Sequence, residues 1–184
     1  PFDLERMLAR MDAAVKGNQL AKSAMDFALH DLQGRILRVP VYKLLGGKYR
    51  EKVPLCWAMG ITSLEEMAKE AEEYVHEGYR CLKAKIGLDP RKDIERLRAI
   101  RESVGDEVEI RADANQAYSP DTAIAVIKRI ERIGLGLQYV EQPVPYWSID
   151  GMAKVAEAVD TPIMADESIF SMHDAVRIIK HGAA

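Results

Sequence analysis

Residues 81–114 carry the sequence CLKAKIGLDPRKDIERLRAIRESVGDEVEIRADA, which predicts a strand, a helix and a second strand in succession. Residues 81–86 and 107–114 are short apolar runs typical of strands. Residues 90–104 between them have helical spacing, and Asp89 stands where a side-chain oxygen can cap the helix. Two strands joined through a helix pair in parallel with a right-handed crossover.

The same alternation extends on both sides of this unit, from residue 51 to residue 184. The further strand candidates are 53–58, 137–142 and 161–165, and the further helix candidates are 63–77, 119–133, 148–158 and 171–181. A serine stands at each of these helix starts and is a predicted cap: Ser63, Ser119, Ser148 and Ser171. The last four strands recur about every 25–28 residues, and this even spacing favours a (β/α) barrel over an open doubly wound sheet.

Residues 1–50 predict helices without strands. Helical spacing covers 4–14 and 18–34, with Asn18 as the predicted cap and Gly34 as the predicted end of the second helix. Val41 to Leu45 predicts a short helix closed by two glycines.

The fold class expected from these elements is α/β, a partial TIM-type (β/α) barrel preceded by helices of an α+β capping domain. Residues 1–50 would supply the helical part of the capping domain, and residues 51–184 the first five βα units. A barrel needs eight strands, so we expect the chain to be an internal portion of a longer native chain.

The composition excludes several classes of function. The 184 residues are 48% hydrophobic and 30% charged, and the formal net charge is −3. Neither a basic patch for nucleic acid nor a polybasic membrane segment is present, and no apolar run approaches the length of a spanning helix. Cys56 and Cys81 lack metal-type spacing and predict small buried hydrophobic residues in a reduced, cytoplasmic setting.

The strand at residues 81–86 places two lysines on one face. Residues i and i+2 of a strand point to the same side, so Lys83 and Lys85 face one way while Leu82, Ala84 and Ile86 face the other. The apolar set can cover the helices, which leaves the lysines facing the barrel interior. Lysine is rarely buried unless it is paired, so negative charge is expected opposite them.

The following strands supply that charge at their carboxyl ends. Asp113 and Asn115 end one strand, Glu141 ends the next, and Asp166 and Glu167 follow the last. This edge is where barrel enzymes carry their chemistry. Each residue alone could be a helix cap or a surface ion pair, but three converging carboxylates would repel one another unless protons or a cation relieved them. A hard ion with oxygen ligands, Mg²⁺ first and Mn²⁺ as a substitute, fits best.

The motifs KAK at 83–85, DAN at 113–115, VEQP at 140–143 and ADES at 165–168, taken in order, resemble the enolase superfamily. Within it they resemble the muconate-lactonizing-enzyme subgroup of the mandelate racemase/muconate lactonizing enzyme family, over nearly the whole chain. The resemblance implies metal ligation by Asp113, Glu141 and Asp166, a base at Lys85 and an electrostatic helper at Lys83. It also implies supporting roles behind the ligands for Asn115 and Glu167. Members of this subgroup carry another lysine on a sixth strand, which we expect beyond residue 184.

The resemblance further implies a Mg-dependent isomerase or lyase that removes the proton alpha to a carboxylate and gives a metal-stabilised enolate. A muconate cycloisomerase-like reaction is the first choice. The alternatives are epimerisation or racemisation of a dipeptide or N-acyl amino acid, and o-succinylbenzoate synthesis. The expected partners are a small-molecule carboxylate and further copies of the chain in a homo-oligomer, with no nucleic acid and no membrane, and the expected location is the cytoplasm.

A different class of function stays open from the residues alone. An inactive fragment or structural module is expected if 184 residues is the native length. Intact mass separates the two, because a whole barrel with a capping domain weighs about 40 kDa, and this chain weighs 20.6 kDa.

Overall fold

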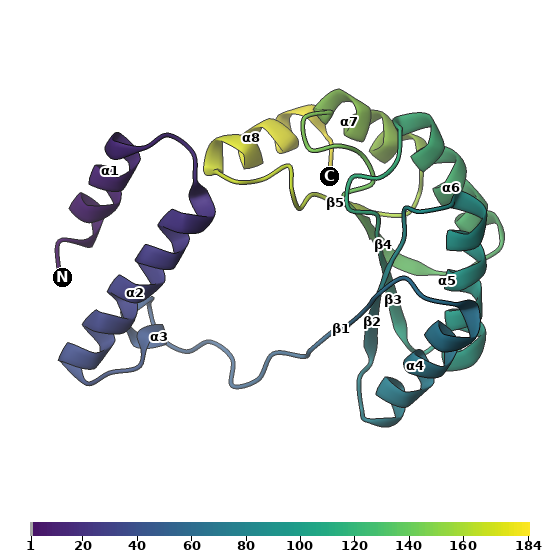
Figure 1. Ribbon diagram of the computed structural model, residues 1–184, viewed down its shortest axis with the longest axis horizontal. Helices are drawn as coiled ribbons and strands as arrows, with labels where there is room; N and C mark the ends of the chain where they lie inside the picture. Colours follow the sequence, from purple (N-terminus) through teal and green to yellow (C-terminus); the bar gives the residue numbers. More distant parts are fainter. Residues whose placement is uncertain (1) are drawn as a thin grey trace. The chain divides into compact units, whose positions relative to one another are not determined.

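The computed structural model describes residues 2–184, which divide into two compact units, one ending at Pro54 and the other running from Leu55 to Ala184 (Figure 1). The first unit is helical, as the sequence predicts. Its helices are α1 (Leu4–Ala14), α2 (Gln19–Leu37) and α3 (Val41–Leu44).

Two predictions about the second helix of this unit are wrong. Asn18 precedes α2 but has a left-handed backbone (φ 55°), so its side chain donates to the Lys16 carbonyl and caps nothing. The helix does not end at Gly34 and continues to Leu37. Gly34 is buried, and a Cβ there would lie 2.8 Å from the Val39 carbonyl oxygen, so the glycine permits a close backbone approach inside the helix.

The second unit is a parallel five-stranded sheet in which the strands lie in chain order. Helices α4 to α7 cover one face of this sheet (Figure 1), which confirms the predicted alternation of strands and helices. The strands are β1 (Trp57–Met59), β2 (Cys81–Lys85), β3 (Glu109–Asp113), β4 (Leu137–Glu141) and β5 (Ile163–Met164). The helices are α4 (Leu64–His76), α5 (Pro90–Val104), α6 (Pro120–Arg132), α7 (Ile149–Ala158) and α8 (Met172–His181).

The hydrophobic core lies between the sheet and these helices. Leu82, Ile110 and Val140 contribute from successive strands, and Met67 and Ile127 contribute from helices. All five are fully buried. Because side chains alternate along a strand, the residues between these core positions face the other side of the sheet.

Four of the five helix caps predicted in the second unit are confirmed. The side chains of Ser63, Asp89, Ser119 and Ser171 accept hydrogen bonds from backbone N–H groups in the first turns of their helices. Ser148 makes no such bond, because its backbone (φ −86°, ψ 61°) lacks the extended conformation that a cap requires.

The first strand is shorter than predicted and begins later. The prediction covered 53–58, whereas β1 begins at Trp57. Val53 and Leu55 lie before the strand and are 73% and 70% exposed. A run of apolar residues becomes a strand only where a neighbouring strand pairs with it, and the pairing with β2 begins at Trp57.

The two cysteines are free thiols: Cys81 lies in β2 and is buried, and Cys56 directly precedes β1 and is partly exposed. Their sulfur atoms lie 3.1 Å apart. Burial, followed by the contact with Cys56, raises the pKa of the Cys81 thiol to about 12. The prediction of a small buried residue is therefore confirmed for Cys81, whereas Cys56 is only partly buried.

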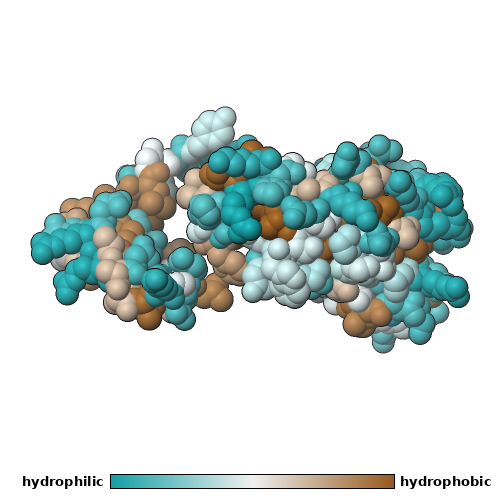
Figure 2. Space-filling model, turned by 90° about the horizontal axis from the view of Figure 1, so that it is seen from above, coloured by the Kyte–Doolittle hydropathy of each residue, from teal (hydrophilic) through white to brown (hydrophobic). Residues whose placement is uncertain are grey.

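Within residues 2–184, no helix has both the length and the apolar character that a membrane span needs. Apolar residues do lie on the surface, where they are interspersed with hydrophilic ones (Figure 2). Met172 and Ile179 on α8 are among the most exposed of them.

Candidate active site

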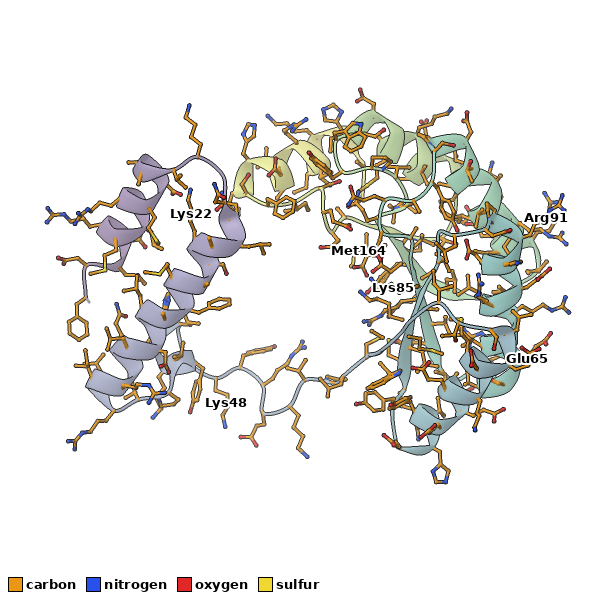
Figure 3. All side chains as sticks on the ribbon, in the orientation of Figure 1. Lys22, Lys48, Glu65, Lys85, Arg91 and Met164 are labelled. Carbon is orange, nitrogen blue, oxygen red and sulfur yellow. The ribbon has the colours of Figure 1, made fainter. Side chains whose placement is uncertain are left out.

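Two lysines of β2 meet carboxylates of β3 and β4 on the face of the sheet away from the helices (Figure 3 labels Lys85). Lys83 Nζ lies 3.2 Å from both carboxylate oxygens of Glu141 and 3.2 Å from Asp113 Oδ2. Lys85 Nζ lies 2.6 Å from Asp113 Oδ2 and 2.6 Å from Asn115 Oδ1. The structure therefore pairs both inward-facing amines with acidic groups, as the sequence predicts.

Strand register brings these residues together. Lys85 pairs with Asp113 across β2 and β3, and Asp113 pairs with Glu141 across β3 and β4. All three end their strands, so they share the carboxyl edge of the sheet. Asn115 follows in a left-handed conformation (φ 41°) that asparagine tolerates, and its N–H donates to Asp113 Oδ1 at 3.0 Å.

The two strand-end carboxyl groups of the cluster have pKa values that are shifted in opposite directions. Burial alone would raise the pKa of Asp113, but hydrogen bonds from Lys85, the Asn115 N–H and Lys83 outweigh it, and the pKa is lowered. Burial alone would lower the pKa of Lys83, but its bonds to Asp113 and Glu141 raise it, so this amine stays charged. The pKa of Glu141 is raised by burial and then by the charge of Asp113, against the hydrogen bond from Lys83. The pKa values of Asp113 and Glu141 therefore shift in opposite directions, although both side chains contact Lys83.

The residues that follow β5 stand beside this cluster. Glu167 Oε1 accepts a hydrogen bond from Asn115 Nδ2 at 3.2 Å, while Glu167 Oε2 is buried with no hydrogen-bond partner among residues 2–184. Asp166 is exposed, and in the described chain its carboxylate makes no hydrogen bond or ion pair. Its negative charge nevertheless contributes to the raised pKa of Glu141.

Six of the seven predicted side chains thus form one connected group, and the seventh lies next to it. The chain of contacts runs Glu141, Lys83, Asp113, Lys85, Asn115, Glu167. Only Asp166 has no direct side-chain contact with the others among residues 2–184.

The donor atoms suit a hard divalent cation in kind. Asp113, Glu141 and Asp166 offer carboxylate oxygens, which Mg²⁺ prefers, and beside them Glu167 Oε2 is a buried oxygen with no hydrogen-bond partner among residues 2–184. In the described residues, however, no three acidic, histidine or cysteine side chains stand close enough together to hold an ion. The two lysine amines lie against Asp113 and Glu141 instead.

Sequence reasoning missed Asp93, a fully buried carboxylate at the start of α5. It accepts hydrogen bonds from the Gly87 N–H at 2.9 Å and from the Tyr118 hydroxyl at 2.7 Å. Gly87 follows β2 and Tyr118 follows β3, so Asp93 joins the loop after Lys85 to the loop that contains Asn115. In the sequence, Asp93 is a charged residue on the helix face that otherwise carries Leu97 and Ile100, and this feature could have identified it.

Sequence reasoning also gave no role to Gln142, the residue after Glu141. Its side chain is fully buried, and its backbone is left-handed (φ 35°). Its side-chain oxygen accepts hydrogen bonds from the Asp166 and Ser168 N–H groups at 3.0 and 3.1 Å. The feature of the sequence that could have indicated a role is the position of Gln142 between the predicted ligand Glu141 and Pro143.

Comparison with known families gives two matches. The family described as "Enolase C-terminal domain-like" matches residues 66–184. The family described as "Mandelate racemase / muconate lactonizing enzyme, N-terminal domain" matches residues 1–46.

Individual relatives include an L-Ala-D/L-Glu epimerase of Clostridium acetobutylicum, 43% identical, with 97% of this chain and 49% of that protein aligned. Muconate cycloisomerase 1 of Rhodococcus opacus is 35% identical, with 99% of this chain and 47% of that protein aligned. The crystal structure of a dipeptide epimerase from Enterococcus faecalis V583, complexed with Mg and the dipeptide L-Leu-L-Tyr, is 38% identical. It superposes with a TM-score of 0.93 over 100% of this chain and 51% of that one. The chain spans about half the length of the relatives it matches.

Proposed function

The chain belongs to the mandelate racemase and muconate lactonizing enzyme family of the enolase superfamily, and from that premise we propose that the whole protein epimerises dipeptides or N-acyl amino acids. The observation that supports this most is the position of Lys85 Nζ at the carboxyl edge of the sheet, 2.6 Å from Asp113. An amine held there is placed to remove the proton from an α-carbon next to a substrate carboxylate.

The roles of the cluster follow from its contacts. Lys85 takes the α-proton on Nζ once that amine is neutral, and Asn115 Oδ1 orients the amine through the 2.6 Å hydrogen bond. Lys83, whose pKa is raised, stays an ammonium group and offsets negative charge that develops on the substrate. Epimerisation also needs an acid on the opposite face of the α-carbon, and the ion pairs of this cluster in residues 2–184 include no third lysine.

Asp113, Glu141 and Asp166 are the proposed ligands of Mg²⁺, with Mn²⁺ as a substitute. The all-oxygen donor set and the position of Asp113 and Glu141 at the carboxyl ends of neighbouring strands support this assignment. Bound there, the ion would supply positive charge for the substrate carboxylate and so stabilise charge that develops as the α-proton leaves.

The relatives support an epimerase before a cycloisomerase, which reverses the order that the sequence motifs favoured. The Clostridium and Enterococcus epimerases are 43% and 38% identical to this chain, and the Rhodococcus muconate cycloisomerase is 35% identical. Muconate cycloisomerisation is therefore the second candidate. The o-succinylbenzoate reaction, the homo-oligomer and the cytoplasmic location stay predictions.

Exchange of the α-hydrogen with solvent tests the proposal. The whole protein with Mg²⁺ in D₂O is incubated with L-Ala-L-Glu, L-Leu-L-Tyr and N-succinyl amino acids, and the α-proton signal is followed by NMR. We expect exchange and epimer formation for one substrate class, and a loss of about 10²–10⁴-fold in Lys85→Met. Lys128→Met, an exposed lysine on α6, is the control and should keep the wild-type rate.

Two other results would contradict parts of this proposal. A whole protein that cyclises cis,cis-muconate and exchanges no amino-acid α-hydrogen would replace the first candidate with the second. Wild-type exchange rates in Lys85→Met would remove Lys85 from its proposed role.

A further inference from the structure

We infer that Gln142 is a positioning residue that fixes the Asp166–Ser168 loop after β5 against the end of β4, and so sets the spacing between Glu141 and Asp166. The inference rests on the proposed function, because it concerns two proposed ligands of the same ion. It comes from the hydrogen bonds of one buried side chain.

The Gln142 amide is fully used. A glutamine side chain accepts through its oxygen and donates twice through its nitrogen. Here Oε1 accepts from the Asp166 N–H at 3.0 Å and the Ser168 N–H at 3.1 Å. Nε2 donates to the Val144 carbonyl at 2.9 Å and to Ser168 Oγ at 2.8 Å.

These partners fix which end of the amide is oxygen. The two backbone N–H groups can only donate, and the Val144 carbonyl can only accept, so a flipped amide would face donors with donors and an acceptor with an acceptor. Because Gln142 is fully buried, no solvent can replace a lost partner. The loop is therefore held in one arrangement.

The backbone of Gln142 makes two further hydrogen bonds to neighbouring segments. Its N–H donates to the Met164 carbonyl at the end of β5, and its carbonyl accepts from the Gln116 N–H in the loop after β3, at 2.9 and 2.8 Å. Its left-handed φ of 35° is uncommon outside glycine and turns the chain at once after Glu141. One residue thus connects the end of β4, where Glu141 lies, to the loops that contain Asn115 and Asp166.

The consequence concerns the acidic groups directly. Glu141 is covalently next to Gln142, and the Asp166 N–H is hydrogen-bonded to the Gln142 side chain. The Gln142 hydrogen bonds to the Asp166 and Ser168 N–H groups also hold the intervening Glu167, which accepts from Asn115 Nδ2 at 3.2 Å. Asp166 needs this support most, since its own carboxylate has no partner in the described chain.

The test compares Gln142→Met with Ile100→Val in the whole protein. Methionine fills similar space without the amide. Ile100 is fully buried in α5 and contacts none of these loops through hydrogen bonds, so Ile100→Val controls for a general loss of stability. Hydrogen exchange at the Asp166 and Ser168 amides is measured without metal, and Mg²⁺ affinity is measured by calorimetry.

We expect faster exchange at both amides and a Mg²⁺ affinity about 10–100-fold weaker in Gln142→Met, with neither change in Ile100→Val. Wild-type protection and affinity in Gln142→Met would overturn the inference, as would equal changes in the control. If Gln142→Met does not fold, Ser168→Ala, which removes the hydroxyl bonded to Nε2, should show the same two changes in smaller measure, and unchanged values overturn the inference.

The metal-free exchange separates this inference from the proposed function. A wild-type protein that binds no Mg²⁺ would reject the metal site, while slow exchange at Asp166 and Ser168 that is lost in Gln142→Met would still support the positioning role. Binding of Mg²⁺ with unaltered exchange in the variant would reject the positioning role alone.

Discussion

Replacing Gly87 with alanine should destabilise the protein and separate the two loops that flank Lys85. Gly87 has φ +117°, and a Cβ there would lie 2.5 Å from Ala117 Cβ and 2.9 Å from the Ala114 carbonyl oxygen. Neither atom can move without its backbone. Ala114 and Ala117 belong to the loop that holds Asn115, so any adjustment would shift Asn115 relative to Lys85.

A second glycine, Gly78, serves as a control that separates the cost of the close contact from the cost of the backbone conformation. Gly78 has φ +108°, and a Cβ there would meet nothing within 4 Å. Alanine at either position carries a backbone strain of about 1–3 kcal/mol, but only Gly87→Ala adds overpacking, worth about 1–3 kcal/mol. The difference between the two variants should therefore be about 1–3 kcal/mol in the free energy of unfolding.

Equilibrium urea unfolding of the wild type, Gly87→Ala and Gly78→Ala, followed by circular dichroism, measures this difference. Gly87→Ala should have the lowest midpoint, with an unchanged slope. Equal losses in the two variants would show that the loops after β2 and β3 do not pack as described and would refute the reasoning.

Two further predictions concern neighbouring groups. Tyr118→Phe removes a 2.7 Å hydrogen bond to the buried Asp93 carboxylate and should cost about 1.5–3 kcal/mol in urea unfolding; a loss below about 0.5 kcal/mol would contradict a structural role for that bond. Asp89 accepts hydrogen bonds from the Lys92 and Arg91 N–H groups, and these bonds lower its pKa. The stabilisation from this cap is therefore fully present above the ordinary aspartate pKa of about 4. It is lost as the pH falls through the lowered pKa of the folded state. The stability gap between the wild type and Asp89→Ala should be full at pH 7 and shrink in acid, and a gap that is constant from pH 7 to pH 2 would refute this linkage.

Much of the second unit could be predicted because its pattern is local. Alternation placed Lys83 and Lys85 opposite the core, and the parallel order of the strands brought Asp113 and Glu141 beside them. A serine or aspartate before a helix was sufficient wherever the backbone was extended, and it failed at Ser148, where the backbone was not.

The remainder depended on contacts that no local pattern carries. Gly34 resembles a helix end in sequence, but it serves close packing against Val39. The buried bonds of Gln142 reach residues that lie 24 and 26 positions further along the chain. Asp166 was correctly expected near the carboxyl edge, yet its free carboxylate could not be foreseen, because it depends on how the loop after β5 turns.

The position of a bound ion tests the central claim most directly. Crystals of the whole protein grown with Mn²⁺ should give an anomalous diffraction peak at the manganese edge, bounded by carboxylate oxygens of Asp113, Glu141 and Asp166 at about 2.0–2.5 Å. Lys83 and Lys85 should then have moved off the oxygens that bind the ion. A saturated crystal in which these carboxylates surround no peak, and in which both lysines keep their present partners, would contradict the account.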